Sequence, residues 1–310
     1  MTEKTYIRNS IGNHMVELGR KDDRVVIVNA DLMKTSRNQS FVQEYPNRSF
    51  NVGIAEQNLV SFSAGLSHEG FKPYVFSMAP FLSMRACEQC RTDIAYGNFD
   101  VCLVGSYSGC SGGISGATHW GLEDYSILSS FPNMTILEPS CTKMAISLLN
   151  KTLSFNGPLY IRVTVEPTED LYSFDAEYEI GGYKVAREGS DGAYICSGVL
   201  VEKALLAAEE IEKKYNKKIK VIDLYTIKPI NQQAITEAVN TGHVIIAQDH
   251  FVVGGLGEKI CAQIALLGTN CKVKVLGVND EFTTMAHADA LYKKYLLDVE
   301  GLEYTMLSIL

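Results

Sequence analysis

Several features that mark other classes of protein are missing from this chain of 310 residues. No apolar stretch approaches the roughly 20 residues that a membrane-spanning helix requires, so we expect no membrane partner. The opening Met-Thr-Glu-Lys begins no apolar signal region, which predicts a cytoplasmic location. The 28 basic and 36 acidic residues include no basic stripe with interleaved aromatic residues, so nucleic acid is not an expected partner.

The cysteine pattern indicates neither a disulfide framework nor a zinc site. The eight cysteines are scattered through apolar runs, as reduced thiols of the cytosol often are. Cys87 and Cys90 make a lone Cys-x-x-Cys with no second pair and no nearby histidine, whereas a structural zinc ion requires four ligands. We expect these two side chains to pack as small buried groups, and we expect no metal ligands in this chain.

What the chain does contain is short apolar runs alternating with amphipathic segments, and its 46% of hydrophobic residues is enough for two domain cores. The first half predicts strands at residues 24–28, 74–77, 101–105, 135–138 and 159–163, with helices at residues 8–18, 55–67, 82–96 and 143–152. The second half predicts strands at residues 193–196, 220–224, 244–248 and 272–276, with helices at residues 201–215, 232–240 and 256–267. This alternation favours an α/β protein of two domains, each a mostly parallel sheet covered by helices. We place the domains at residues 1–166 and 190–310, joined by a polar, irregular linker at residues 167–189.

The most informative segment is residues 51–58, which read Asn-Val-Gly-Ile-Ala-Glu-Gln-Asn. A glycine ends a short extended run, and a helix then begins with Glu56 in an apolar neighbourhood. Leu59, Phe62 and Leu66 follow at helical spacing, so one face of this helix is predicted to be buried. A carboxylate in a first turn is favoured by the helix dipole, and this is one interpretation of Glu56. The other is a buried carboxylate that hydrogen-bonds a ring nitrogen of a cofactor.

The segment resembles the Gly-Ile-Ala-Glu-Gln segment in the pyrimidine-binding domain of transketolases and related thiamine diphosphate enzymes. Further resemblances to this family lie at residues 29–32, 116–119, 131–134, 221–224, 228–230 and 254–257, and at His250. They keep the family's order and spacing from about Arg8 to the C-terminus. The resemblance implies a thiamine diphosphate-binding pyrimidine domain followed by a transketolase C-terminal domain.

The same resemblance implies thiamine diphosphate as the cofactor and gives roles to several side chains. Glu56 would hydrogen-bond N1' of the aminopyrimidine, and His119 would face the thiazolium and the substrate, so both are candidate catalytic residues. Asp31, Met78 and Phe81 would line the cofactor site, the latter two as part of its apolar wall. From the residues alone, a loop acid, ordinary core packing and a packed imidazole remain open as alternatives.

Four further residues match positions that contact the sugar in this family. Arg8 and Arg162 correspond to arginines that hold the phosphate of a sugar phosphate, for which the guanidinium fork is suited. Surface solvation is the alternative, although Arg162 interrupts an apolar strand. Tyr107 and Ser115 replace a histidine and an aspartate of the family, so the resemblance implies an unusual sugar, such as a branched or sulfonated one.

Half of the expected cofactor site is missing from the sequence. The family binds the diphosphate and Mg²⁺ through a Gly-Asp-Gly sequence, and the nearest segment here, Gly189-Ser190-Asp191-Gly192, lies at the end of the predicted linker. The resemblance therefore implies a split enzyme, in which an N-terminal transketolase subunit supplies the diphosphate and metal site. It also implies self-association of this chain through two-fold symmetry.

The implied activity is transfer of a two-carbon ketol unit from a ketose phosphate to an aldose phosphate. Two enzymes that share the two-domain plan are alternatives: the beta subunit of a 2-oxoacid dehydrogenase, and deoxyxylulose phosphate synthase. The first carries a His-Ser-Gln-Ser-Pro-Glu type segment where this chain has His-Trp-Gly-Leu-Glu-Asp, which favours transketolase. A non-catalytic paralogue is a third alternative, and retention of Glu56 and His119 argues against it.

Overall fold

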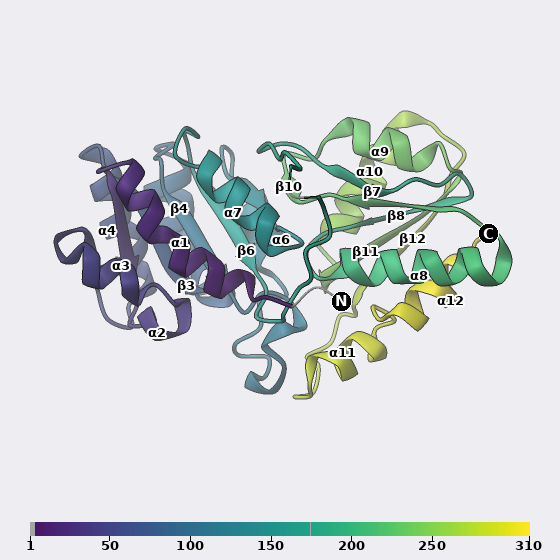
Figure 1. Cartoon of the computed structure of the whole chain (residues 1–310), viewed down its shortest axis with the longest axis horizontal. Helices are drawn as coiled ribbons and strands as arrows, with labels where there is room; N and C mark the ends of the chain where they lie inside the picture. The colour runs from purple at the N-terminus through teal and green to yellow at the C-terminus, as the bar shows by residue number, and fades with distance from the viewer. Residues whose placement is uncertain (1–3, 174) are drawn as a thin grey trace.

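The computed structural model describes residues 4–173 and 175–310, and it has two lobes, each built on one sheet (Figure 1). The first sheet has seven strands in the order β10-β5-β6-β4-β3-β1-β2, and the second has five in the order β12-β11-β8-β9-β7. Nearly all neighbouring strands are parallel; β10 on β5 and β7 on β9 are the antiparallel pairs. The predicted α/β class with two mostly parallel sheets is confirmed.

The first lobe contains these elements in chain order: α1 (Ile7–Lys21), β1 (Val25–Asn29), α2 (Met33–Ser36), α3 (Gln39–Glu44), η1 (Pro46–Arg48), β2 (Ser49–Asn51), α4 (Glu56–His68), β3 (Lys72–Met78), η2 (Phe81–Arg85), α5 (Cys87–Gln89), η3 (Cys90–Ala95), β4 (Cys102–Ser106), η4 (Cys110–Ser115), α6 (Asp124–Ser129), β5 (Thr135–Leu137), α7 (Thr142–Lys151) and β6 (Leu159–Val163). Its central strands β1, β4 and β6 are buried along their whole length, as strands covered on both faces require.

The remaining elements are β7 (Lys184–Arg187), β8 (Gly192–Cys196), α8 (Leu200–Tyr215), β9 (Ile219–Asp223), β10 (Thr226–Lys228), α9 (Gln232–Val239), β11 (His243–Phe251), α10 (Leu256–Leu267), β12 (Lys272–Val278), α11 (Ala288–Lys294) and α12 (Val299–Leu307). Helices α9 and α10 cover one face of the second sheet, and α8 and α12 cover the other (Figure 1). Among the residues described, no helix is both long and apolar enough to cross a membrane.

Three local features differ from the sequence-based prediction. The predicted helix at residues 82–96 is divided into η2, α5 and η3, and η2 and η3 are π-helical. The last part of the predicted linker forms β7, which pairs with β9. Strand β10, from the second half of the chain, joins the first sheet beside β5, so the two halves of the chain are interlocked.

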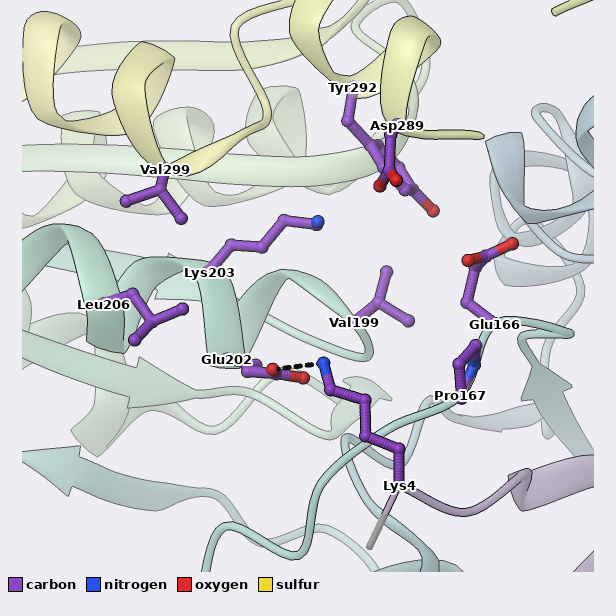
Figure 2. A pocket seen from close by; sticks show the side chains of 10 residues that line it. All are labelled: Lys4, Glu166, Pro167, Val199, Glu202, Lys203, Leu206, Asp289, Tyr292 and Val299. Atoms are coloured by element: carbon purple, nitrogen blue, oxygen red, sulfur yellow. Dashed lines mark hydrogen bonds and ion pairs between the residues drawn. The ribbon is translucent and has the colours of Figure 1, made fainter. Parts of the chain in front are cut away.

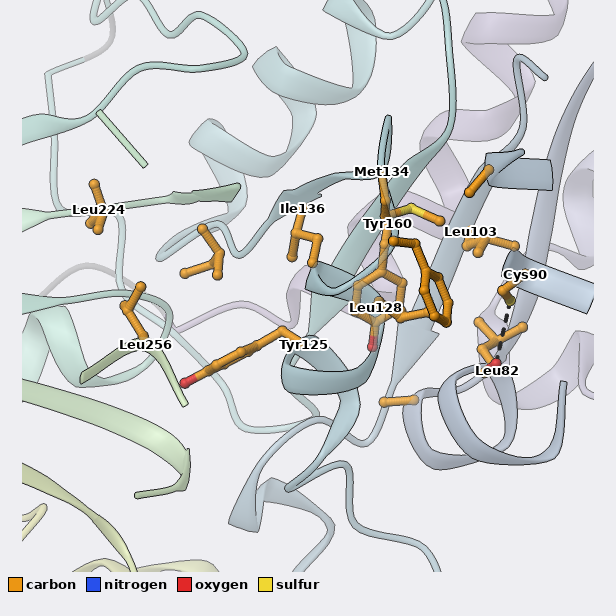
Figure 3. Close-up of a cluster of buried hydrophobic side chains, with 14 of the residues drawn as sticks. Leu82, Cys90, Leu103, Tyr125, Leu128, Met134, Ile136, Tyr160, Leu224 and Leu256 are labelled. Carbon is orange, nitrogen blue, oxygen red and sulfur yellow. Dashed lines mark hydrogen bonds between the residues drawn. The ribbon is translucent and has the colours of Figure 1, made fainter. Parts of the chain in front are cut away.

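A hydrophobic cluster continues from one lobe into the other (Figure 3). Leu82 and Leu103 of the first lobe belong to the same buried cluster as Leu224 and Leu256 of the second, with Tyr125 between them in the view. Burial of apolar side chains across a domain junction opposes relative movement of the domains. The loops at this junction are therefore held by both lobes.

Candidate active site

The candidate residues gather where neighbouring parallel strands of the first sheet end. Strands β4, β3, β1 and β2 are adjacent, and their carboxyl ends are at Ser106, Met78, Asn29 and Asn51. The predicted residues Tyr107, Phe81, Asp31 and Glu56 each follow one of these ends. Ligands of open parallel sheets bind outside the carboxyl ends of the strands, so the topology assembles one site from segments distant in sequence.

Glu56 is the first residue of α4, and its side chain is buried, with only 1% exposed. Its carboxylate accepts a hydrogen bond from Ser77 Oγ at 3.1 Å on one oxygen and from Arg85 Nη1 at 2.6 Å on the other. Both partners come from β3 and the turn after it rather than from the start of α4. The carboxylate is therefore held by tertiary contacts, which favours the functional interpretation over simple capping.

Arg85 and the Phe81 ring connect His119 to this carboxylate. The Arg85 guanidinium carbon lies 4.2 Å from the centroid of the Phe81 ring, and the Phe81 and His119 rings meet edge to face with centroids 5.6 Å apart. His119 is half-buried, and its Nδ1 shares a 2.9 Å hydrogen bond with Thr118 Oγ1. Met78 ends β3 and is also half-buried. The structure thus brings a carboxylate, an aromatic ring and an imidazole together.

The glycine-rich loop that carries His119 is fixed by both lobes. Gly109 has φ 61°, and a Cβ there would lie 2.0 Å from a carboxylate oxygen of Asp249, so only glycine fits. Asp249, from the second lobe, accepts a 2.8 Å hydrogen bond from the Cys110 backbone N–H. Trp120 is buried and donates to the Gly113 carbonyl at 3.1 Å. Trp120 is therefore the side chain of this loop that packs in the core, whereas the neighbouring His119 imidazole is partly accessible to solvent.

Asp31 follows the carboxyl end of β1. Its backbone is left-handed, with φ 59°, and its side chain is exposed. The Asn51 side chain accepts from the Asp31 backbone N–H at 3.0 Å and from the Gly53 backbone N–H at 3.1 Å. Asn51 thereby holds the loop of Asp31 against the segment that leads into α4. Asn51 ends a short extended run, but no local pattern in the sequence indicates this contact with the loop of Asp31.

Two of the predicted substrate residues meet at the same edge of the sheet. The Arg8 guanidinium carbon lies 5.9 Å from the Tyr107 ring centroid, and the buried Arg8 Nε has no hydrogen-bond partner among the described residues. A small pocket beside them is lined by Arg8, Ser36, Phe76, Val104, Ser106 and Val163. Tyr107 has φ 62°, an uncommon conformation for a residue other than glycine. Ser115 ends η4 and is half-buried.

The resemblance implied that Arg162 holds the phosphate of the substrate, and the structure contradicts this role. Its side chain is completely buried and forms ion pairs with Asp124, at 2.9 Å, and with Glu138. Its Nη2 also donates to the backbone carbonyls of Gly121, at 2.8 Å, and Asp249, at 2.7 Å. A guanidinium that already has these partners and no exposure is not open to a substrate phosphate. Arg162 instead joins the two lobes.

Other buried ionisable groups surround Arg162. Burial raises the pKa of the Glu138 carboxyl, which also accepts a hydrogen bond from Ser197 of the second lobe at 2.6 Å. The His250 imidazole stacks on the Tyr125 ring with centroids 3.8 Å apart, and burial lowers the pKa of His250 to about 4. His250, which matches the family's C-terminal domain, is therefore a neutral imidazole packed between the two lobes.

The cysteine pair lies in the helical segment after β3. Cys90 is buried, its Sγ donates to the Leu82 carbonyl at 3.4 Å (Figure 3), and burial raises the pKa of its thiol. Cys87 is half-buried. Within residues 4–173 and 175–310, no three His, Cys, Asp or Glu side chains are grouped so as to hold a metal ion.

A cavity of about 320 Å³ lies elsewhere, where the N-terminal segment, the residues after β6, α8 and α11 meet. Figure 2 shows Glu166, Lys203 and Asp289 directed toward its centre, while Lys4 pairs with Glu202 at its edge. Burial and the nearby Asp289 carboxylate raise the pKa of Glu166. None of the predicted site residues lines this cavity.

Comparison with known proteins identifies the family. The family model of the transketolase pyrimidine-binding domain matches residues 3–168, and that of the transketolase C-terminal domain matches residues 181–302. The 6-deoxy-6-sulfo-D-fructose transketolase subunit SqwH of Clostridium sp. (strain MSTE9) is 35% identical over 296 residues, which are 94% of this chain and 91% of that protein. A subunit of the apulose-4-phosphate transketolase of Phocaeicola vulgatus is 32% identical, over 97% of this chain and 96% of that protein.

A match to a longer enzyme is partial: 1-deoxy-D-xylulose-5-phosphate synthase of Clostridium perfringens is 32% identical, but the chain spans 49% of it. Among solved structures, a split-gene transketolase, described as an inactive beta4 tetramer, matches with a TM-score of 0.89 and 31% identity over 98% of both chains. The transketolase from Campylobacter jejuni subsp. jejuni NCTC 11168, at 16% identity and a TM-score of 0.83, shows the same fold. The chain therefore belongs to the transketolase family of thiamine diphosphate-dependent enzymes and contains its pyrimidine-binding and C-terminal domains.

Proposed function

We propose that this chain is the pyrimidine-binding and C-terminal subunit of a split transketolase, which transfers a two-carbon ketol unit from a ketose to an aldose. The observation that carries the proposal is the buried Glu56 carboxylate, fixed by Ser77 and Arg85 beside the Phe81 ring. A buried carboxylate with lone pairs to spare, next to an aromatic wall, fits the aminopyrimidine half of thiamine diphosphate. When bound, this cofactor supplies the carbanion stabilisation that ketol transfer requires.

Each site residue then has a task that suits its position. Glu56 would hold the aminopyrimidine through a ring nitrogen and share a proton there, while Phe81 and Met78 would form the apolar wall of the ring. Asp31 would contact the cofactor from the neighbouring strand end. His119 would donate a hydrogen bond to the substrate oxygen that gains negative charge, since its imidazole is accessible and its loop is rigidly held.

The diphosphate and Mg²⁺ would be bound mainly by a separate N-terminal transketolase subunit. Two relatives of matching length, from Clostridium and Phocaeicola, are themselves transketolase subunits, which supports this division. Two of these chains and two partner chains would assemble around a two-fold axis, the usual closure for such complexes. The cofactor would lie between a pyrimidine-binding domain and the diphosphate-binding domain of a partner.

The test is to assay the chain alone and with the product of its neighbouring gene, in the presence of thiamine diphosphate and Mg²⁺. We expect ketol transfer by the pair and none by the isolated chain, because half of the cofactor site would be absent. The pair should also run as a two-plus-two complex in native mass spectrometry. Full turnover by the isolated chain, or a 1:1 complex with full activity, contradicts the split-enzyme proposal. A preference for pyruvate as the donor would instead favour the deoxyxylulose phosphate synthase alternative.

The substrate end of the site should recognise an anionic or otherwise unusual sugar through Arg8, Tyr107 and Ser115. The buried Arg8 Nε has no hydrogen-bond partner within residues 4–173 and 175–310, and the Arg8 guanidinium carbon lies 5.9 Å from the centroid of the Tyr107 ring. The Clostridium relative acts on 6-deoxy-6-sulfo-D-fructose and the Phocaeicola relative on apulose 4-phosphate, so sugars of this kind belong in the first panel.

Replacing Arg8 by alanine should weaken use of sugars that end in an anion by about 1.5–3 kcal/mol, or roughly 10- to 150-fold in kcat/KM, because a charged hydrogen bond is lost. The measurement is kcat/KM for donors and acceptors with and without a terminal phosphate or sulfonate. Arg20→Ala, at the exposed opposite end of α1, is the matched control. Equal losses on charged and uncharged sugars would place the anion site elsewhere.

A further inference from the structure

The carboxylate of Glu56 is buried, yet the group that balances its charge reaches it from the solvent side. Arg85 donates to Glu56 at 2.6 Å while its own side chain is 46% exposed and that of Glu56 is 1% exposed. An ionised carboxylate without a partner is costly to bury, so this guanidinium stabilises the charged Glu56 in its buried position. We propose that Arg85 is the positioning residue for Glu56, an inference that rests on the proposed function.

The two donors fix the plane of the carboxylate. Ser77 holds one oxygen from β3, and Arg85 holds the other from the turn after β3, so the Glu56 side chain cannot rotate without breaking one of them. Each carboxylate oxygen keeps a further acceptor site. Glu56 can therefore engage a ring nitrogen while both donors stay in place, and the direction of that contact is set before the ligand arrives.

The backbone explains why Arg85 reaches Glu56 and the Phe81 ring together. Element η2 is a π-helical turn from Phe81 to Arg85, closed by a 3.1 Å hydrogen bond from the Ala86 N–H to the Phe81 carbonyl. Single π-helical turns are frequent at functional sites. Here the wide turn places the guanidinium 4.2 Å from the Phe81 ring centroid. Arg85 thus links the orientation of the carboxylate to that of the aromatic wall.

The experiment is a double-mutant cycle of Arg85→Gln and Glu56→Gln in the enzyme assembled with its partner subunit. With Glu56 present, Arg85→Gln should lower kcat and weaken thiamine diphosphate binding by about 10- to 100-fold, the size of loss seen when the orienting partner of a metal ligand is removed. In the Glu56→Gln background, the same change should alter the cofactor Kd by less than about twofold. Arg85→Lys should recover part of the loss. Arg91→Gln, an exposed arginine in η3, is the matched control and should leave both quantities unchanged.

A second readout needs neither cofactor nor partner. In thermal unfolding of the isolated chain, Arg85→Gln should lower Tm more when Glu56 is present than in the Glu56→Gln background. Equal effects of Arg85→Gln in both backgrounds, on cofactor Kd and on Tm, overturn the positioning role. A wild-type complex that binds no thiamine diphosphate overturns the proposed function instead, so the two failures are distinguishable.

Discussion

Replacing Glu56 by glutamine is expected to reduce ketol transfer by the assembled enzyme at least about 100-fold while the chain stays folded. Glutamine has nearly the same shape and can still accept a hydrogen bond from Ser77. Its amide cannot hold a proton for a ring nitrogen, and it no longer neutralises Arg85. The measurement is kcat at saturating cofactor, with far-UV circular dichroism and Tm as checks on folding.

The control for this variant is Glu69→Gln, which changes the exposed glutamate that caps the other end of α4. It should retain wild-type kcat because its carboxylate is solvated and far along the helix from the site. If Glu56→Gln also retained near-normal kcat, the assignment of Glu56 to the cofactor would be wrong.

The second large effect concerns stability. Arg162→Met is expected to lower the free energy of unfolding by about 3–5 kcal/mol, because it leaves Asp124 and Glu138 buried without their shared cation. Urea unfolding monitored by fluorescence and by circular dichroism measures this loss. If transketolase activity survives at low temperature, the loss should be equal for charged and uncharged sugars, in contrast to Arg8→Ala.

A compensating variant separates lost charge balance from lost packing. Adding Asp124→Asn and Glu138→Gln to Arg162→Met removes the unpaired charges, so part of the stability should return. Arg20→Met, which removes an exposed pair with Glu44, should leave the unfolding midpoint unchanged. A destabilisation by Arg162→Met no larger than that of Arg20→Met would show that the buried network is not important for stability.

The parts of the fold that the sequence predicted are those set by local pattern. Strands β1 and β4 follow largely apolar runs, and β6 does so apart from Arg162, because a strand covered on both faces has no polar side to interrupt the signal. Strands β7 and β10 are short and depend on partners far along the chain, so no local pattern marks them. The break of the helix at residues 82–96 is also set by packing, since that segment contains neither glycine nor proline.

For the candidate site, the resemblance pointed to Glu56 and His119, and contacts through Arg85 and Phe81 connect the two in the structure. The sequence did not show that Arg85 holds Glu56, because their contact joins the start of α4 to the turn after β3. The interpretation of Arg162 was wrong for a related reason. An arginine inside an apolar strand indicates a buried or site cation, but only the three-dimensional arrangement shows that Asp124 and Glu138 already surround it.

The pairing of β10 with β5 also affects the order in which the protein can be completed during synthesis. When residues 4–166 have left the ribosome, the edge of the first sheet at β5 is still open, because Thr226–Lys228 has not yet been translated. An open strand edge can pair with other chains, so a nascent first lobe is exposed to association until the second lobe emerges. Folding of the first lobe therefore finishes only after much of the second has been made.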